Sequence, residues 1–309
     1  MPCDTPIPFA VEVAGIRFNY SYPANIQLNP LQDWYLPFIC HHGKLPNQMD
    51  ITVELTFDDP PDTAALRTIF DTDGSWSLLT DGRDNYIRLD APGSSEGPIW
   101  IAKTSTNFRH VRVHCGDVLK RTQNDVVTVH NVAAQYPLDQ ILFINILAHN
   151  QGLLIHSTGL SLDNHAFVFP AVSGGGKSTL SRLLIQAGIP GLSLLSDDRI
   201  IIRRLADGFH AFGTPWPGDA HIARNESAPL AGLYFLTQGT HTKVTPLPPK
   251  EILARLFPVS SIPWYDRALT ESSLSLCEAL LADVPAFDFQ FSTDADEVAK
   301  AVSELPMAS

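Results

Sequence analysis

The sequence has few cysteines, and none of them stands close to another. Four cysteines are spread over 309 residues, and no two of them form a C-x-x-C pair. Disulfide frameworks depend on regularly spaced cysteines, whereas proteins of the reducing cytosol keep their cysteines unpaired. We therefore expect a cytoplasmic protein without a disulfide framework. The four residues are Cys3, Cys40, Cys115 and Cys277.

The sequence also lacks a long uninterrupted apolar run. Its most apolar stretch, residues 141–155, is broken by Asn145, His149 and Asn150, and a membrane-spanning helix needs about 18 or more apolar residues in succession. The N-terminus has no basic region and carries Asp4 among early prolines, which is not the pattern of a secretion signal. We expect neither a membrane partner nor export.

Basic residues are in the minority. The chain has 21 lysines and arginines against 33 aspartates and glutamates, which gives a formal net charge of −12. Nucleic-acid binders present a basic face to the phosphate backbone, so we do not expect a nucleic-acid partner. A local basic pocket for phosphate groups is still compatible with this charge. Hydrophobic residues make up 44% of the chain, which is enough for a globular core.

The first part of the chain is dominated by predicted strands. Short segments alternate apolar and polar residues, and turn-forming residues such as those at 58–61 and 81–82 separate them. We predict that residues 1–132 form a mostly β domain, which is a candidate for recognising a substrate. The predicted strands are 11–20, 50–57, 76–79, 86–90, 99–104, 108–115 and 126–132.

From about residue 133 the predicted elements alternate between strands and helices. This mixture predicts an α/β domain over residues 133–309, and the hairpins expected at Asp163-Asn164 and Asp207-Gly208 predict a mixed rather than a purely parallel sheet. The predicted helices are 137–151, 177–186, 250–256, 269–281 and 295–305. The predicted strands are 153–162, 166–169, 193–196, 199–204, 209–212, 230–236 and 287–291.

The strongest functional signal is a glycine-rich loop between a predicted strand and a predicted helix. That context is the one a phosphate-binding loop requires. Glycines allow the backbone N–H groups to turn inward, and the helix N-terminus adds unpaired donors and a positive dipole end. A lysine would reach the β- and γ-phosphates of ATP, and Ser178 would offer its hydroxyl to Mg²⁺. The predicted cofactor-binding residues are Ser173, Gly174, Gly175, Gly176, Lys177, Ser178 and Thr179.

The loop departs from the G-x-x-x-x-G-K-[ST] pattern at one position. Ala171 stands where the first glycine belongs, and its methyl group could narrow the entrance of the loop. The alternative interpretation is an ordinary glycine-rich turn that happens to precede a lysine. The strand before the loop and the helix after it favour phosphate binding over this alternative.

Two adjacent carboxylates, Asp197 and Asp198, follow the next predicted strand. Adjacent side chains on a strand point in opposite directions, so one is expected to face a metal ion and the other a substrate. Paired anions raise at least one pKa, which suits a general base. The alternative is a solvated turn. His156, on the strand before the loop, is either an assistant to the base or an ordinary core histidine.

A cation that neutralises the transferred phosphoryl group is also expected. Arg224 is our candidate because it closely follows a rigid aromatic segment, residues 213–218, which either walls the site or is a plain connection. His110, His114 and Cys115 form a weaker cluster that suits a metal site less well than an ordinary strand. The other arginines that remain open for the phosphoryl role are Arg199, Arg203, Arg204 and Arg267.

The glycine-rich loop at 173–178, the upstream His156 and the downstream Asp197-Asp198 pair together resemble the HPr kinase/phosphorylase family, and most closely its shorter relatives. The resemblance covers residues 153–236 best and does not extend to residues 1–132. It implies an α/β domain of the phosphoenolpyruvate carboxykinase/HPr kinase-like fold with a mixed sheet. In that family the histidine and one aspartate serve an attacking serine hydroxyl.

Carried over to this chain, the resemblance implies that Asp197 is the base, His156 its helper, and Ser178 and Asp198 the metal ligands, with the reversed split of the aspartates also open. Two departures weaken the link to HPr itself. Thr179 follows Ser178 where true HPr kinases have an acidic residue, and the C-terminal part carries no clear copy of their HPr-binding signature.

The expected function is therefore an ATP- and Mg²⁺-dependent kinase, with Lys177 and Arg224 neutralising charge. Its acceptor would be a serine-type hydroxyl of a peptide, a protein or a small molecule. Two alternatives remain at this point: a nucleotide-binding regulatory module without phosphate transfer, and carboxykinase chemistry. The sequence leaves the oligomeric state open and is compatible with a homo-oligomer.

Overall fold

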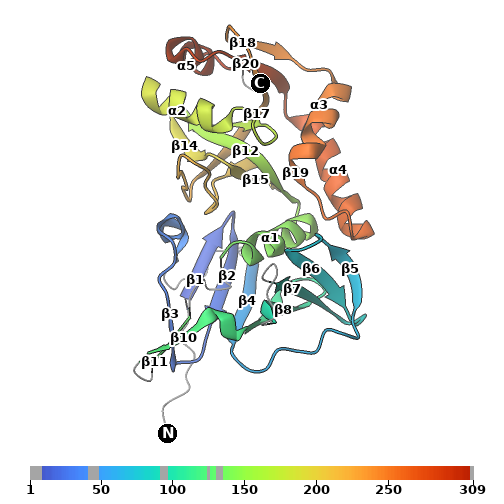
Figure 1. Cartoon of the computed structure of the whole chain (residues 1–309). Coiled ribbons are helices and arrows are strands. Elements are labelled where there is room, and N and C mark those ends of the chain that lie inside the picture. The colour runs from blue at the N-terminus through green and yellow to red at the C-terminus, as the bar shows by residue number, and fades with distance from the viewer. Residues whose placement is uncertain (1–8, 41–48, 91–96, 124–125, 130–134, 307–309) are drawn as a thin grey trace. The chain divides into compact units, whose positions relative to one another are not determined.

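The computed structural model of the chain describes residues 9–40, 49–90, 97–123, 126–129 and 135–306. It divides into two compact units, residues 1–146 and 147–309, which are considered separately (Figure 1). The domain boundary expected after residue 132 falls within 130–134, outside the described residues. The division between the units lies within helix α1 (Leu138–His149).

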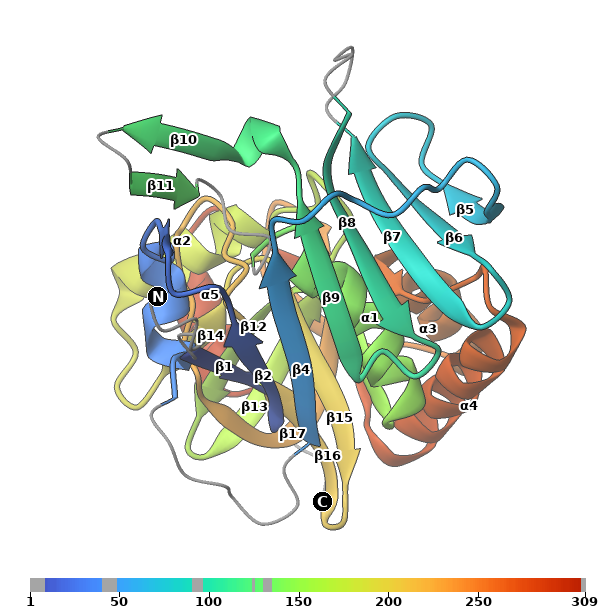
Figure 2. The ribbon, with the colours of Figure 1, turned by 90° about the horizontal axis from the view of Figure 1, so that it is seen from below.

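The first unit is built on a mixed eight-stranded sheet, whose strands lie side by side in Figure 2 in the order β1-β2-β4-β9-β8-β7-β6-β5. The contacts of β4 with β2 and with β9 are parallel, and the other neighbours are antiparallel. A smaller sheet joins β10, β11 and β3. The mostly β character expected from the sequence is thus found in this unit.

The elements of the first unit, with η for a 3-10 helix, are β1 (Phe9–Val13), β2 (Ile16–Ser21), β3 (Ile26–Leu28), η1 (Asp33–Phe38), β4 (Met49–Thr56), β5 (Arg67–Asp71), β6 (Trp76–Thr80), β7 (Asp84–Asp90), β8 (Pro98–Ser105), β9 (His110–Cys115), η2 (Asp117–Leu119), β10 (Lys120–Gln123), β11 (Val126–Val129) and most of α1.

The segment expected to form one strand from residue 11 to residue 20 is a hairpin. Ala14 and Gly15 both have positive φ, 53° and 72°, and this pair of values suits a two-residue turn that matches the twist of the flanking strands. The turn was missed because Ala14 is apolar and continues the hydrophobic pattern. The strand expected at 126–132 is present as β11 up to Val129, and its remainder lies outside the described residues.

A buried polar contact and an aromatic contact help to anchor helix α1 to the first unit. The Tyr35 hydroxyl donates to Asp139 Oδ2 at 2.5 Å, and Phe143 packs on Phe18 with the ring centroids 4.7 Å apart. Burial raises the pKa of Tyr35, and the negative charge of Asp139 raises it further. The phenol therefore stays protonated and can hold the helix N-terminus in place.

The second unit contains a mixed nine-stranded sheet in which two long strands change partners along their length. The first half of β12 (Gly152–Leu162) pairs with β15, and its second half pairs with β13 and β14. Strand β17 (Ser227–Gln238) pairs with β16, then with β13, then with β20. The pairings close a ring of β12, β15, β16, β17 and β13. The mixed α/β architecture expected for this part is confirmed.

The remaining elements of the second unit are β13 (His165–Pro170), α2 (Lys177–Ala187), β14 (Ser193–Ser196), β15 (Arg199–Leu205), β16 (Gly208–Phe212), β18 (Lys243–Pro246), α3 (Pro249–Leu256), η3 (Phe257–Val259), β19 (Ser260–Ser261), α4 (Arg267–Asp283), β20 (Ala286–Phe291) and α5 (Ala295–Ser303).

Two hydrophobic clusters fix the helices of the second unit on the sheet. Leu180 and Leu184 of α2 and Val298 of α5 join one cluster with the aromatic residues of β13, β17 and β20. Helices α3 and α4 belong to the other cluster, which is built on β12, β15 and β17. Figure 1 shows α2 and α5 on one side of the strands and α3 and α4 on the other.

Within the described residues, no helix combines the length and the apolar character needed to cross a membrane.

The aromatic cluster beneath α2 and α5 should control the stability of the second unit. Phe289 is fully buried and contacts Phe169 and Tyr234. Replacing it with alanine should lower the free energy of unfolding by about 3–5 kcal/mol, because a large cavity is left. Trp264 is 58% exposed, so Trp264→Ala should cost less than about 1 kcal/mol. Equal costs in chemical denaturation followed by circular dichroism would contradict this assignment of the core.

Candidate functional site

A polar pocket of about 330 Å³ lies where the glycine-rich loop meets the middle of β12 and the end of β14. The register explains the meeting: Ser157 of β12 pairs with Pro170, which precedes the loop, and Gly159 pairs with Ser196, which precedes the two aspartates. The pocket is lined by His156, Ser173, Gly174, Gly176, Lys177, Ser178, Thr179, Asp198, Gly218, Asp219 and Gln238. Eight of these positions are predicted site residues.

The three glycines of the loop are each required by its conformation. Gly174 and Gly176 have φ of 76° and 101°, a region that other residues rarely adopt. A Cβ on Gly175 would lie 2.7 Å from Ala171 Cβ, and one on Gly176 would lie 2.6 Å from Phe291 Cζ. At Gly175 and Gly176 the backbone therefore packs against Ala171 and Phe291 at distances that leave no room for a side chain.

Ala171 does not narrow the pocket. Its side chain is buried in the hydrophobic cluster beneath the loop, and its N–H donates to the carbonyl of His156. The substitution of the expected glycine is accommodated because Gly175, opposite it, has no side chain. The departure from the motif is thus compensated within the loop.

Lys177 is the first residue of α2 and is almost fully buried, with 7% of its surface exposed. Its Nζ has only long contacts, 3.4 Å to the carbonyl of Ala171 and 3.9 Å to Asp198 Oδ1. Burial lowers the pKa of the ammonium group, and the charge of Asp198 counteracts that shift. The charge is therefore incompletely compensated, and an anion in the pocket would complete its coordination.

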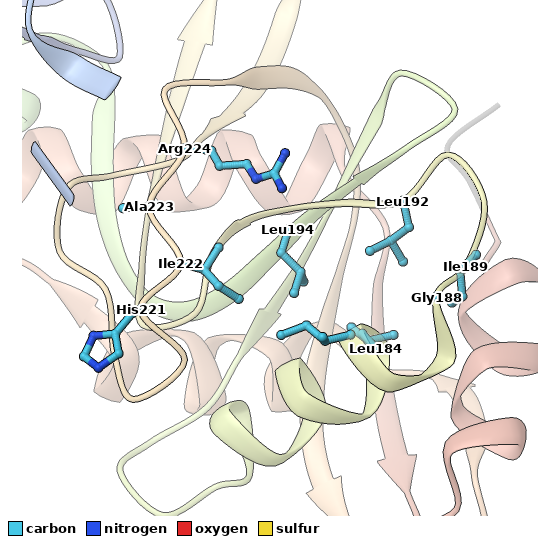
Figure 3. A pocket seen from close by; sticks show the side chains of 10 residues that line it. Leu184, Gly188, Ile189, Leu192, Leu194, His221, Ile222, Ala223 and Arg224 are labelled. Carbon is cyan, nitrogen blue, oxygen red and sulfur yellow. The ribbon is translucent and has the colours of Figure 1, made fainter. Parts of the chain in front are cut away.

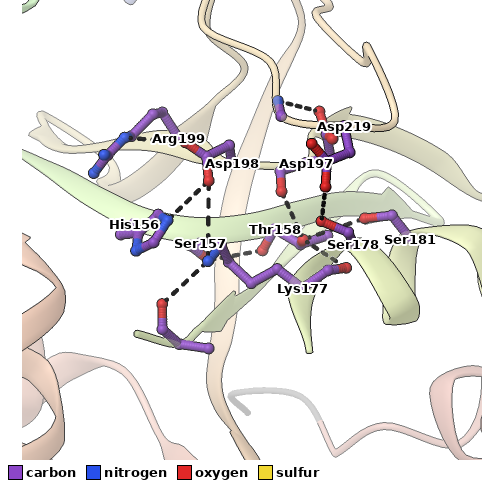
Figure 4. Close-up of polar contacts among 12 residues, drawn as sticks. His156, Ser157, Thr158, Lys177, Ser178, Ser181, Asp197, Asp198, Arg199 and Asp219 are labelled. Carbon is purple, nitrogen blue, oxygen red and sulfur yellow. Dashed lines mark hydrogen bonds and ion pairs between the residues drawn. The ribbon is translucent and has the colours of Figure 1, made fainter. Parts of the chain in front are cut away.

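Asp198 is the aspartate that faces the pocket. Its Oδ1 lies 2.8 Å from His156 Nε2, and its Oδ2 lies 3.2 Å from Arg199 Nε (Figure 4). Burial by itself would raise the pKa of Asp198, but the hydrogen bond to His156 and the nearby positive charges hold it below its ordinary value. The carboxylate is ionised near neutral pH and can accept a proton.

Asp197 points away from the pocket and binds the following loop. It is 1% exposed, and its two oxygens accept backbone N–H groups from Gly218 at 3.0 Å, Ala220 at 2.7 Å and Ile222 at 3.2 Å. The two aspartates do point in different directions, as expected for adjacent residues. The carboxylate of Asp197 thus holds residues 218–222 in place through their backbone N–H groups.

Two residues that sequence reasoning missed complete the polar surface around the loop. Asp219 Oδ2 lies 3.5 Å from Ser178 Oγ on the rim of the pocket. Thr158, fully buried, contacts the carbonyls of Lys177 and Asp197 and the hydroxyl of Ser181, and so ties β12 to α2 and to the aspartates. Asp219 directly follows the aromatic segment that ends at Gly218, but no residue pattern around it marks it as part of a site.

Arg224 is not part of the polar pocket. Its guanidinium lies 3.2 Å from Ser193 Oγ and 3.6 Å from Glu226, and it lines a separate groove. Of the alternative arginines, Arg199 alone contacts Asp198 among the described residues. The sequence placed Arg224 near the site because it follows residues 213–218. The chain instead runs away from the pocket between Asp219 and Arg224, antiparallel to β14.

The other sequence candidates do not assemble into a site. His110 and His114 lie on β9 of the first unit, and no group of three or more His, Cys, Asp or Glu side chains arranged for a metal ion occurs among the described residues. His41 and His42 lie outside these residues. Trp216 of the aromatic segment is buried, and Thr214 donates to the carbonyl of Arg199.

The sequence matches no model of a known protein family and no curated protein.

The Asp197 contacts should make this residue a determinant of stability. Asp197→Asn replaces an oxygen that accepts N–H groups with an NH₂ group, so a buried donor faces donors. The free energy of unfolding should fall by about 2–4 kcal/mol. Asp296→Asn at the exposed start of α5 is the matched control and should cost less than about 1 kcal/mol. If both variants unfold at the same denaturant concentration, Asp197 does not hold the segment.

Substitution of Lys177, in contrast, should stabilise the ligand-free protein. Burial disfavours its charged form, and its partners are distant, so Lys177→Met removes a desolvated charge while keeping the aliphatic stem. The free energy of unfolding without ligand should rise by on the order of 1 kcal/mol. Chemical denaturation tests this directly. A clear loss of stability would mean that the ammonium group is already well paired in the free protein.

Proposed function

We propose that this protein is an ATP-dependent kinase that transfers the γ-phosphate to a serine-type hydroxyl of a peptide, a protein or a small molecule. One observation carries the proposal: an incompletely compensated lysine and an ionised aspartate that is hydrogen-bonded to a histidine line the same pocket, together with the glycine-rich loop. A cation for phosphate and an acceptor for a proton are the two groups that phosphoryl transfer to a hydroxyl requires.

The loop and the start of α2 would bind the triphosphate. Glycines at 174–176 bring the backbone close to whatever occupies the pocket, and Gly176 has no side chain to cap the first N–H groups of the helix. These donors and the positive end of the helix dipole favour an anion. Lys177 would contact the β- and γ-phosphates and gain the compensating charge that it lacks in the free protein.

Asp198 is our candidate for the general base, with His156 as the residue that orients it. In the proposed step the acceptor oxygen attacks the γ-phosphorus, the bond to the β,γ-bridging oxygen breaks, and the hydroxyl proton passes to Asp198. ADP leaves with the electron pair of the broken bond. The hydrogen bond from His156 at 2.8 Å fixes one carboxylate oxygen. This assignment reverses the split expected from the resemblance, because three N–H groups already occupy the oxygens of Asp197.

The residues on the rim fit a magnesium ion. Ser178 and Asp219 present a hydroxyl and a carboxylate 3.5 Å apart, and Mg²⁺ prefers a few such oxygen ligands together with phosphate oxygens and water. Bound there, Mg²⁺ would neutralise charge on the β- and γ-phosphates. Ser178 and Asp219 would hold it. In this proposal Asp219 takes the place of Asp198, which was expected from the sequence to bind the metal ion and is assigned here as the base.

We also propose that the second unit has the phosphoenolpyruvate carboxykinase/HPr kinase-like fold. Support comes from the order and pairing of its parts: a histidine on β12, an antiparallel return along β13, the glycine-rich loop, and two aspartates where β12 changes partner from β14 to β15. The proposal concerns residues 147–309 and leaves the first unit unassigned.

Variants of the two aspartates test the mechanism. With γ-labelled ATP, Mg²⁺ and a pool of serine-containing acceptors, Asp198→Ala should lose transfer by at least about 100-fold while still binding ATP, because it removes the base and not the phosphate donors. Lys177→Met should lose ATP binding itself in calorimetry. Normal transfer by Asp198→Ala would overturn the assignment of the base.

The same experiment separates the proposed kinase from the two alternative functions. Tight binding of Mg-ATP by the wild-type protein without any labelled product would indicate a nucleotide-binding regulatory module. Consumption of ATP only when oxaloacetate is added would indicate carboxykinase chemistry. An absence of binding by the wild-type protein would remove all three.

A further inference from the structure

A second cavity of the same unit, of about 410 Å³, lies beside α2 and is distinct from the polar pocket. Its floor consists mainly of aliphatic side chains from the second half of α2, the turn after it and the start of β14, and residues 221–224 form its wall (Figure 3). We call it the aliphatic groove. Its lining residues are Leu184, Ile185, Gly188, Ile189, Leu192, Leu194, His221, Ile222, Ala223 and Arg224.

The aliphatic groove and the polar pocket are formed by the same two elements. Helix α2 contributes Ser178 to the pocket and Ile185 to the groove, seven residues further on, which is about 10 Å along the helix axis. The segment that Asp197 fixes contributes Asp219 to the pocket and Ile222 to the groove. About three residues of extended peptide span such a distance.

The groove lies on the side of the glycine-rich loop that carries the proposed base. Strand β13, which leads into the loop, has β12 on one side and β17 on the other. Asp198 and Leu194 of the groove both belong to the β12 side, because β14 pairs with β12. Gln238 ends β17 on the opposite side. A molecule in the groove would therefore reach the proposed position of the γ-phosphate from the side on which the proposed base Asp198 lies.

The floor of the groove favours an aliphatic ligand. Ile185 is 57% exposed, and it lies beside other aliphatic side chains of the groove, which together form an apolar surface. Leu184 and Leu194 beneath it are buried, so the floor is rigid. Burying an aliphatic side chain against it would remove apolar surface on both partners from water, which favours binding.

The rim of the groove carries a cation, Arg224, whose present carboxylate partner can be replaced. The Arg224 side chain is about half exposed, and its ion pair with Glu226, at 3.6 Å, is also on the surface. Ion pairs exposed to solvent contribute little to stability, so an incoming carboxylate can replace Glu226 at little cost. A guanidinium binds a carboxylate through two parallel hydrogen bonds, which adds selection for an acidic group next to the aliphatic one.

We propose that the aliphatic groove binds the phosphate acceptor, and that this acceptor is a peptide segment with an aliphatic side chain beside a carboxylate, about three residues from the serine that is phosphorylated. The carboxylate is either an acidic side chain or the C-terminus of the peptide. This inference rests on the proposed kinase function, and it assigns to Arg224 a role in acceptor recognition instead of phosphoryl transfer.

The test uses the full-length chain with ¹³C-labelled isoleucine methyl groups and a synthetic peptide. The peptide has the sequence Ser-Ala-Ala-Leu-Glu, with an acetylated N-terminus and an amidated C-terminus. Saturable shifts are expected at Ile185, Ile189 and Ile222, while Ile252 and Ile262, outside the groove, stay unchanged. Replacing leucine with serine, or glutamate with glutamine, should weaken binding by at least about tenfold. The glutamine peptide is also made with a free C-terminal carboxylate in place of the amide. If this carboxylate restores binding, the groove can take its negative charge from the C-terminus of the peptide as well as from an acidic side chain.

Variants of the protein provide the matched controls. Ile185→Glu and Arg224→Gln should each weaken peptide binding by about tenfold or more and leave Mg-ATP binding unchanged, because neither residue lines the polar pocket. Leu205→Glu and Arg267→Gln change exposed residues of the same types elsewhere in the unit and should have no effect. Equal binding by all four variants, an absence of saturable shifts, or shifts of the groove isoleucines caused by Mg-ATP would each overturn the proposal.

The two proposals fail in distinguishable ways. If the peptide binds in the groove and the wild-type protein does not bind ATP, the groove is a peptide site and the proposed kinase function is wrong. If ATP binds and serine peptides are phosphorylated equally by wild type, Ile185→Glu and Arg224→Gln, the kinase function stands and the groove is not the acceptor site.

Discussion

The carboxylate of Asp197 is the contact on which the organisation of the second unit's sites depends. It satisfies three backbone N–H groups of residues 218–222 in an almost fully buried position. That segment carries Asp219 into the polar pocket and Ile222 into the aliphatic groove. Gly218 is required for the close approach, because a Cβ there would lie 3.0 Å from Asp197 Oδ2. One buried side chain thus shapes two neighbouring surfaces without lining either of them.

The polar pocket concentrates charge at a cost to the free protein. Lys177 is buried with distant partners, whereas Asp198 has close ones in His156 and Arg199. Groups held in this way are typical of sites prepared for a charged ligand, since the missing compensation arrives with it. This asymmetry, together with a glycine-rich backbone that no side chain shields, favours an anionic ligand over a purely structural role.

Sequence reasoning found the parts of the polar pocket that are local and missed those that are not. The glycine-rich loop, Lys177 and Ser178 follow one another in the chain between a predicted strand and a predicted helix. The sequence pattern alone was therefore enough to group them. Asp198 was noticed because it and Asp197 are adjacent carboxylates that follow a predicted strand. The resemblance implied a role for His156 as well, but as the partner of Asp197, whereas in the structure His156 contacts Asp198. Asp219 and Thr158 were missed because nothing in their surroundings marks them. They reach the site only through the pairing of β12 with β14 and the contact of residue 223 with Ser196.

The sequence by itself determined the mixed α/β character of the second part, its glycine-rich loop between a strand and a helix, and the strand-rich first part. Those features depend on local periodicity and on residues with unusual backbone freedom. Only the tertiary structure decided which aspartate faces the pocket, that Arg224 lies in a different cavity, and that α2 borders both. The reason is that side-chain direction at the end of a strand depends on which strand lies beside it. In this unit β12 changes its partner between β14 and β15, the position of the two aspartates.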